Sequence, residues 1–335
     1  MPTITLFPVS VESKTGFIDA KGKVKIQPQF DFAGPFSEGL AIFGIWDPDR
    51  KSDPISRGWK AKYGFINPAG DVVIAPTFDQ AFDFKDGLAP VRVGIRWGYC
   101  NVKGEVVVKP QFDQIGEFSE GLASARIKKK WQVLDSSGEV VFALEATTVA
   151  PCHDGLMSCE RQRKWSYLDR KGKTAIELTC TAAEDFSERL AAVLKNRRMG
   201  FIDIKGEWVI PPRFGQASRF REGHARVQFV ADGPYDGAAP QDFGFIDRTG
   251  ERQPPGSFAM AGEFSEGLAA VCADRAEGWA YIDTHGKTKI PPIQCDSAGE
   301  FGGGLAAVAV RDPATGESRW GYIDQKGKYV WKPTT

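Results

Sequence analysis

The sequence contains no apolar run of 18 residues, and no stretch places apolar residues at i, i+3, i+4 and i+7 over three helical turns. These absences argue against a membrane-spanning helix and against a long amphipathic helix. Lys and Arg number 43, as do Asp and Glu, so the formal net charge is zero. A chain without net charge creates no global field that would attract nucleic acid or a membrane surface.

Several chemical signatures are also missing. The six cysteines form no Cys-x-x-Cys pair and are irregularly spaced, so neither a zinc site nor a disulfide framework is predicted. The glycines do not precede a helix, which argues against a phosphate-binding loop. The segment Met1–Phe7 is too short and lacks the basic residues of a signal peptide. We therefore expect a cytoplasmic protein without a cofactor or metal.

Two short motifs alternate along the chain. One motif, Phe-Ser-Glu-Gly-Leu-Ala, occurs eight times in exact or degenerate form, and four consecutive units repeat every 34 residues. Repetition of this kind indicates an array of similar structural units, and we expect residues 1–335 to form one repeat domain with incomplete terminal units. The other motif, Gly-aromatic-Ile-Asp-x-x-Gly, occurs nine times in exact or degenerate form, and its copies begin at Gly16, Gly64, Gly98, Trp131, Trp165, Gly200, Gly244, Ala280 and Gly321.

Each unit consists of short apolar runs separated by turn residues. In one unit the runs are Gly121–Ile127, Trp131–Leu134 and Val140–Phe142, rich in Val, Ile and aromatic residues, which is typical of strands. The Asp of Asp-x-x-Gly can bond its own backbone and the Gly can adopt positive φ, so this segment predicts a turn. Pro28, Pro76, Pro110, Pro211 and Pro291 are expected to end the third run. We predict three meandering strands and a shorter fourth.

The strands are apolar on both faces, as in Gly267–Val271. A sheet of such strands must be covered twice, and without helices only the neighbouring sheet can cover it. The sequence therefore predicts an all-β fold of tandem blade-like repeats packed face to face, β-propeller-like, with an open β-superhelix as the alternative. Whether the array closes into a ring stays open.

The two motifs resemble the bacterial WG-repeat (KWG-repeat) family over roughly residues 11–333. The resemblance rests on the Phe-Ser-Glu-Gly-Leu-Ala segments and on Lys130-Trp131, Arg96-Trp97-Gly98-Tyr99 and Arg319-Trp320-Gly321-Tyr322-Ile323-Asp324. Trp-Gly itself is kept only at 97–98 and 320–321. The resemblance implies a β-repeat scaffold for interactions, and it carries over no catalytic residues.

The cysteines occupy mainly apolar positions of the repeat, where a free thiol behaves as a small hydrophobe. Cys180 and Cys295 stand where Phe112 does, whereas Cys272 stands at the polar position of Arg126. We expect reduced core thiols, with Cys272 the first to react. The three histidines fall at different repeat positions and the recurrent Asp suits a turn, so no catalytic constellation is predicted and we expect a protein that is not an enzyme.

One group of residues does suggest a function. Basic residues cluster in the hairpins between the Gly-Leu-Ala run and the following aromatic run, and residues 96, 130, 164 and 198 are in register. Stacked units would align them in a basic column without intervening acids, a repulsive arrangement that is costly unless a ligand uses it. The column comprises Arg92, Arg96, Arg126, Lys128, Lys129, Lys130, Arg161, Arg163, Lys164, Lys195, Arg197 and Arg198.

Insertions provide a second candidate surface. They fall in the same hairpin of the repeat, over 44–62 and 229–243, which places them on one face of an array. Their candidate contact residues are Trp46, Arg50, Trp59 and Tyr235.

These surfaces favour a protein-interaction scaffold for an acidic protein partner, with neutralisation of a toxin or effector as one use. Nucleic-acid binding along the basic column is a weaker alternative, because Trp and Tyr are not interleaved with the basic residues as stacking platforms. A carbohydrate- or metabolite-binding or hydrolytic propeller is the third alternative. The partner and the oligomeric state are not specified by the sequence.

Overall fold

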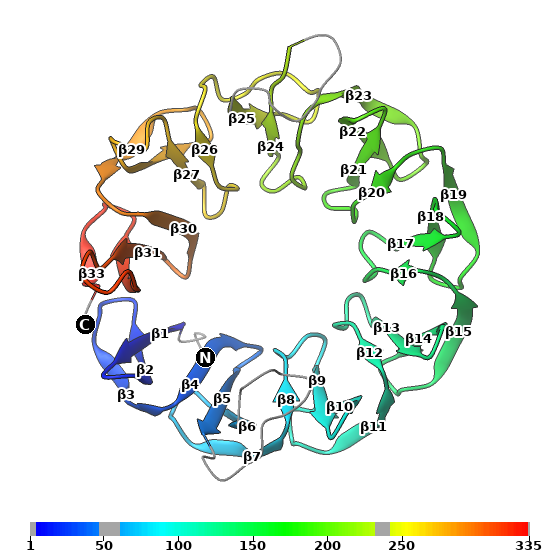
Figure 1. The fold of residues 1–335 in the computed structure, drawn as a ribbon, viewed down its shortest axis with the longest axis horizontal. Coiled ribbons are helices and arrows are strands. Elements are labelled where there is room, and N and C mark those ends of the chain that lie inside the picture. Colours follow the sequence, from blue (N-terminus) through cyan, green and yellow to red (C-terminus); the bar gives the residue numbers. More distant parts are fainter. Residues whose placement is uncertain (1–4, 47–60, 232–241, 334–335) are drawn as a thin grey trace. The chain divides into compact units, whose positions relative to one another are not determined.

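The computed structural model describes residues 5–46, 61–231 and 242–333, which form antiparallel β-strands and no helix (Figure 1). No helix that could cross a lipid bilayer is found in this described part of the chain. Two compact units are present. Unit 1 comprises Met1–Cys152 and Arg170–Gly172, and unit 2 comprises His153–Asp169 and Lys173–Thr335.

Unit 1 begins with a three-stranded sheet, β1-β2-β3, followed by the four-stranded sheets β4 to β7, β8 to β11 and β12 to β15. Its strands are β1 (Leu6–Val11), β2 (Lys14–Asp19), β3 (Val24–Phe30), β4 (Phe32–Ser37), β5 (Leu40–Trp46), β6 (Ala61–Ile66), β7 (Val72–Phe78), β8 (Gln80–Ala81), β9 (Leu88–Val93), β10 (Arg96–Asn101), β11 (Val106–Phe112), β12 (Gln114–Ile115), β13 (Leu122–Ile127), β14 (Lys130–Asp135), β15 (Val140–Glu145) and β16 (Thr148–Val149).

Unit 2 contains β17 to β19, the four-stranded sheets β20 to β23, β26 to β29 and β30 to β33, and the pair β24-β25. Its strands are β17 (Leu156–Arg161), β18 (Lys164–Asp169), β19 (Thr174–Leu178), β20 (Ala182–Ala183), β21 (Leu190–Lys195), β22 (Arg198–Asp203), β23 (Trp208–Phe214), β24 (Ala225–Gln228), β25 (Phe243–Ile246), β26 (Met260–Ala261), β27 (Leu268–Cys272), β28 (Trp279–Asp283), β29 (Thr288–Ile293), β30 (Ser297–Gly302), β31 (Leu305–Arg311), β32 (Ser318–Asp324) and β33 (Tyr329–Trp331).

The strand order within a sheet follows the order of the motifs. In the sheet β8 to β11, the two-residue strand β8 pairs with β9, β9 carries the Gly-Leu-Ala motif, β10 carries the aromatic motif, and β11 is the opposite edge. The predicted meander of four strands is therefore confirmed, and the first sheet lacks the fourth strand. The fourth strand is short in most sheets, as in the two-residue β8, but β4 and β30 have six residues each.

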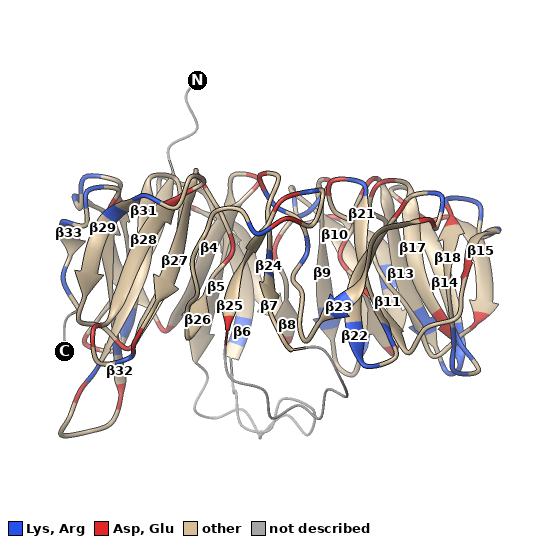
Figure 2. Ribbon diagram, turned by 90° about the horizontal axis from the view of Figure 1, so that it is seen from above, with Lys and Arg blue, Asp and Glu red and all other residues tan. Residues whose placement is uncertain are grey.

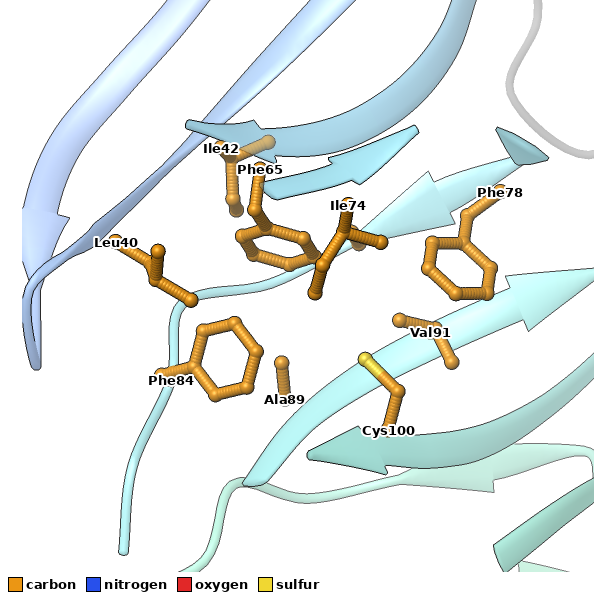
Figure 3. Packing of buried hydrophobic residues seen from close by; sticks show 10 residues of the cluster. Leu40, Ile42, Phe65, Ile74, Phe78, Phe84, Ala89, Val91 and Cys100 are labelled. Carbon is orange, nitrogen blue, oxygen red and sulfur yellow. The ribbon is translucent and has the colours of Figure 1, made fainter. Parts of the chain in front are cut away.

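Apolar side chains of successive sheets fill the space between them (Figure 3). In unit 1, Leu40 and Ile42 of β5, Phe65 of β6 and Ile74 and Phe78 of β7 pack with side chains of the next sheet, namely Phe84, Ala89, Val91 and Cys100. All are buried, so both faces of an inner sheet are withdrawn from water, as the unbroken apolar runs predict.

A pair of aromatic rings recurs in this core, one from the aromatic motif and one from the first residue of the next Phe-Ser-Glu-Gly motif. Tyr99 and Phe118 have ring centroids 4.7 Å apart, as do Tyr167 and Phe186. The buried Tyr99 hydroxyl donates a hydrogen bond to the Gly116 carbonyl at 2.7 Å. Such pairs combine large apolar burial with a preferred ring geometry.

The Ser-Glu-Gly turn links each sheet to the next through polar contacts. Ser37 Oγ donates to the carbonyl of Phe84 at 2.8 Å, and the Glu38 carboxylate accepts the backbone N–H of Gly87, also at 2.8 Å. The same acid-to-amide contact is made by Asp86, Asp154, Glu188, Glu222 and Glu266. The recurrent acids therefore act as cross-sheet hydrogen-bond acceptors.

The Asp-x-x-Gly segments form the predicted turns. Asp135 Oδ1 accepts hydrogen bonds from the backbone N–H groups of Ser137 and Glu139, and Gly138 has φ of 87°. The hydrogen bond from the Ser137 hydroxyl, together with the backbone donors, lowers the pKa of Asp135. Asn67 and Asn101 make the same two backbone contacts in other units, so the turn uses the side-chain oxygen rather than the charge.

The prolines do not end the third run, contrary to the prediction. Pro110 lies within β11, which continues to Phe112. The pairs Trp97↔Phe112 and Tyr99↔Val108 show that β11 bulges opposite Gly98, and a Cβ on Gly98 would lie 2.8 Å from the Pro110 nitrogen. The Gly of the aromatic motif thus makes room for the proline bulge of the neighbouring strand.

The two degenerate units support this coupling. Gln132 and Ser166 stand at the Gly position, and β15 and β19, which pair with these strands, contain no proline. Their pairing is regular across this point, with Gln132 opposite Ala143 and Ser166 opposite Glu177. In these two units the bulge is absent together with the Gly, whereas in the β28–β29 pair Ala280 stands at the Gly position and the register still shifts opposite it.

The expected reactivity of the cysteines is wrong in one respect. Cys272 is only 1% exposed, whereas Cys180 and Cys295, predicted as core residues, are half-buried. The reason is that β27 is covered on both faces, so its last residue is also buried. Cys100, Cys152 and Cys159 are buried as predicted, and all six cysteines are unpaired.

Replacement of Gly98 by Ala should destabilise the protein by about 2 kcal/mol or more, because the new Cβ would force the bulge of β11 to move. The matched control is Gln132→Ala, at the same position of a unit without a bulge, where the loss should stay below about 1 kcal/mol. Equilibrium urea denaturation of both variants measures the difference. Equal losses would contradict the coupling between Gly98 and the bulge.

Candidate interaction surface

The predicted basic residues lie at two-residue turns that join consecutive strands. We call these turns and their flanking residues the hairpin ends. In unit 1 they include the β9–β10 and β13–β14 hairpins, and in unit 2 the β17–β18 and β21–β22 hairpins. Figure 2 shows Lys and Arg at the ends of strands and in the connecting turns, including those of β22.

In unit 1, an Asp that follows the outer strand links the hairpin ends. Asp79 Oδ1 accepts a hydrogen bond from Lys62 Nζ at 2.7 Å, and its Oδ2 accepts the Gly94 N–H at 2.6 Å. Asp31 makes the equivalent contacts, both to Lys14 and to the N–H of Trp46. The hydrogen bond from Lys14 lowers the pKa of Asp31, so this carboxylate is ionised at neutral pH.

Asp113 continues this series and corrects the prediction for Arg96. It forms an ion pair with Arg96 and accepts the backbone N–H of Lys128 at 2.6 Å. The expectation of a column without intervening acids is therefore wrong at Arg96. Arg92 does not belong to the surface either, because its guanidinium is buried and donates to Gln80 and to the Gly94 carbonyl.

Arg126 is half-buried and lies over the Trp131 ring, with Cζ 5.7 Å from its centroid, whereas the three lysines that follow it are exposed. Lys128, Lys129 and Lys130 form the end of the β13–β14 hairpin, and none of them makes an ion pair with a described residue. Glu145 is the cross-strand neighbour of Lys130.

Unit 2 lacks the linking Asp at its two basic hairpins. Arg96 and Asp113 are 17 residues apart, and the residues at this distance from Lys164 and Arg198 are Thr181 and Gly215. The hairpin ends Arg161–Lys164 and Lys195–Arg198 contain no acidic residue. Asp stands after the outer strand at Asp31, Asp79, Asp113 and, in unit 2, Asp296, and it is replaced at Thr147, Thr181 and Gly215. The Lys128–Lys130 hairpin of unit 1 therefore also lacks the linking Asp, but there Glu145 is the cross-strand neighbour of Lys130.

The cations of these two ends make few contacts within the protein. Arg161, Arg163, Lys164 and Arg197 are exposed and form no ion pair with any described residue. Lys195 lies over the Trp208 ring with Nζ 6.0 Å from its centroid. Arg198 is half-buried and donates to the carbonyl of Ala231 at 2.8 Å, so it is less available than the others.

The turns at these ends hold arginine in an unfavourable backbone conformation. Gln162 and Arg163 have φ of 50° and 65°, and Asn196 and Arg197 have φ of 52° and 62°. Two consecutive positive values define a type I′ hairpin turn, which favours Asn and Gly. Arg in this region is strained, and strain of this kind is enriched at functional positions.

The second predicted surface lies mostly outside the described residues. Arg50, Trp59 and Tyr235 fall in the gaps, and only Trp46 is described. Trp46 ends β5 and is 47% exposed.

The described residues contain no group of three or more His, Cys, Asp or Glu side chains placed to hold a metal ion. The thiol closest to charged groups is Cys152, with Sγ 3.4 Å from Glu120 Oε2. Burial raises its pKa to about 12, so its reactive thiolate form is scarce at neutral pH.

Replacement of Arg163 or Arg197 by Gly should stabilise the protein by roughly 0.5–1 kcal/mol, because the cost of positive φ is removed and only partly offset by the chain entropy of glycine. Arg161→Gly is the control, since Arg161 lies in a strand and does not have positive φ. That variant should be destabilised. Thermal unfolding of the three variants measures the effect, and a loss of stability in Arg163→Gly would show that the arginine is not strained.

Comparison with protein families shows one match. The WG containing repeat matches six segments that together cover more than half of the chain: residues 16–44, 63–94, 97–131, 165–197, 199–229 and 279–312. No curated protein sequence is similar enough to count as a relative.

Solved structures match this chain at low sequence identity. The crystal structure of the eukaryotic initiation factor matches 98% of this chain and 95% of its own, with a TM-score of 0.66 and 10% identity. Kluyveromyces lactis Hsv2p matches 63% of this chain and 74% of its own, with a TM-score of 0.37 and 12% identity. A protein of unknown function from Bacteroides caccae matches 65% of this chain and 91% of its own, with a TM-score of 0.29 and 15% identity. Only the first likeness is close enough to compare folds, and it shows the fold alone.

Proposed function

We propose that this chain, which belongs to the WG-repeat family, is a non-catalytic scaffold that binds an acidic protein partner at the hairpin ends of unit 2. The partner would lie on Arg161, Arg163, Lys164, Lys195 and Arg197, with Arg198 at the margin. A toxin or effector with an acidic surface is one class of partner that such a scaffold would neutralise. We also propose a cytoplasmic location, in keeping with six unpaired thiols.

The observation that carries this proposal is the missing Asp. Where Asp79 and Asp113 are present, a carboxylate neutralises the cation of the hairpin. Thr181 and Gly215 stand at this position in unit 2, so no carboxylate is present there, and like charges within each hairpin repel. A carboxylate of the partner protein would neutralise these cations, as Asp79 and Asp113 neutralise Lys62 and Arg96 in unit 1.

Protein is favoured over nucleic acid as the source of the negative charge. Binding of single strands relies on aromatic side chains on which bases stack. Trp165 directly follows Lys164, and Trp208 lies beneath Lys195. Both rings are partly buried against the apolar cluster of Tyr167 and Ile176. The two hairpin ends therefore offer charge and guanidinium groups without stacking surfaces.

The test is a charge reversal in the full chain, with poly-L-glutamate as the probe. The triple variant Arg163→Glu, Lys164→Glu and Arg197→Glu should fold normally, because these side chains are exposed, yet bind the probe at least about tenfold more weakly. The control is Lys173→Glu, Lys205→Glu and Lys287→Glu, which changes the net charge equally. These exposed lysines lie at Asp-x-x-Gly turns of unit 2.

Binding is measured by titration at two salt concentrations, because contacts between charged groups weaken with salt. Retained affinity in the first variant, or an equal loss in the control, would contradict the proposal. Duplex DNA serves as the second probe. If the first variant loses DNA binding and keeps poly-L-glutamate binding, the surface is a nucleic-acid site instead.

A further inference from the structure

The hairpin ends of unit 1 differ chemically from those of unit 2. Their cations Lys62 and Arg96 are paired with Asp79 and Asp113. Their tips instead carry large apolar side chains: Val93 is 49% and Ile95 60% exposed on the β9–β10 hairpin, and Ile45 is 46% exposed beside Trp46 on β5. We call Ile45, Trp46, Val93 and Ile95 the apolar edge.

Aliphatic residues at these tips are unusual. Hairpin turns are normally built from Gly, Asn, Asp and other polar residues, and Gly94 meets that requirement with φ of 61°. Ile95, next to it, has no role in the turn that needs an apolar side chain. Val93 and Ile95 lie together at the tip of one hairpin, and exposed apolar residues grouped in this way with charged residues beside them mark interaction sites on proteins.

The tip of the β9–β10 hairpin is held in place from both sides. The Gly94 N–H is bound by Asp79, and the Arg96 side chain by Asp113. Asp113 also binds the N–H of Lys128, so the next hairpin is fixed beside it. The apolar tip and the lysine tip thus form one connected surface within unit 1.

Charge complementarity identifies the occupant. The paired cations leave the apolar edge close to neutral, whereas Lys128 and Lys129 on the adjoining tip are exposed and have no ion pair with described residues. We propose that this surface binds a short segment of a partner protein that carries apolar anchor residues next to acidic residues. A short segment suits the few side chains available, since a stable interface between globular domains buries about 800 Å² on each partner.

This site is separate from the one proposed in unit 2, because it adds apolar recognition that the unit 2 hairpins do not offer. The two can therefore be tested independently on the full chain. The probe is a fluorescein-labelled 12-residue peptide of alternating Leu and Glu, compared with the same peptide of alternating Ser and Glu. Fluorescence anisotropy at constant ionic strength gives the two affinities.

The parent chain should bind the Leu-Glu peptide at least about tenfold more tightly than the Ser-Glu peptide. The variant Val93→Ser, Ile95→Ser should lose this preference while keeping its affinity for the Ser-Glu peptide. The control is Val140→Ser, Val141→Ser, which removes two exposed valines from β15 in the same unit and should keep the preference. The double variant Lys128→Glu, Lys129→Glu should weaken the binding of both peptides. It tests the lysine tip without changing the apolar tip.

Three results would overturn the inference: equal binding of both peptides by the parent, an equal loss of preference in the Val140 and Val141 control, or unchanged binding by the lysine variant. The unit 2 charge reversal at Arg163, Lys164 and Arg197 should leave the preference for Leu intact. Failure of the function proposed above would appear as unchanged poly-L-glutamate binding in that variant. The two failures are therefore distinguishable.

Discussion

The contact between the two sequence motifs of successive sheets is the interaction on which the fold depends. An aromatic ring from one sheet, such as Tyr99, meets Phe118 of the following Phe-Ser-Glu-Gly motif. At the turn of that motif, a carboxylate binds the backbone amide of the next turn. The rings bury apolar surface and the carboxylates fix the spacing. Each sheet thus needs its neighbour, as is general for repeat proteins.

This division of labour explains why the opposite hairpin ends can vary. The Ser-Glu-Gly turns supply cross-sheet contacts in both units, whereas the Asp links of the other edge occur at Asp31, Asp79, Asp113 and Asp296 and are lost at Thr147, Thr181 and Gly215. Because loss of the Asp link leaves the aromatic core intact, those hairpins can carry exposed cations such as Lys164 and strained arginines such as Arg163 and Arg197. We infer that stability resides at one edge and binding at the other.

Much of the fold was predictable because the repeat aligns equivalent residues. The strand meander, the short fourth strand and the Asp-x-x-Gly turns all follow from local propensity and periodicity. The proline bulge was not predicted, because it depends on the close backbone approach of Gly98 to Val108 and Pro110 of the paired strand, a contact that residue type and spacing do not show. The sequence also did not predict the burial of Cys272 and Arg92. Both lie in strands that are covered on both faces, where polar and apolar positions are equally buried.

The candidate site was predicted in part. Periodicity placed the basic residues at hairpin ends, and the structure locates them there. Periodicity could not show which cations are neutralised, because the partner of Arg96 is the carboxylate of Asp113, 17 residues away and directly after β11. Whether a cation can bind a partner thus depends on which side chains lie beside it in the folded protein and not on the number of basic residues. The proposed site therefore comprises the two basic hairpins of unit 2 and not the whole column.

Hydrogen exchange with mass-spectrometric detection, in the presence and absence of saturating poly-L-glutamate, tests this account most directly. Amides of residues 161–164 and 195–198 should become protected on binding, whereas amides at 93–96, whose cation is already paired with Asp113, should exchange at unchanged rates. Protection confined to the Asp-x-x-Gly turns, or to 93–96, with none at the two unit 2 hairpins, would contradict the claim that missing internal carboxylates create the binding site.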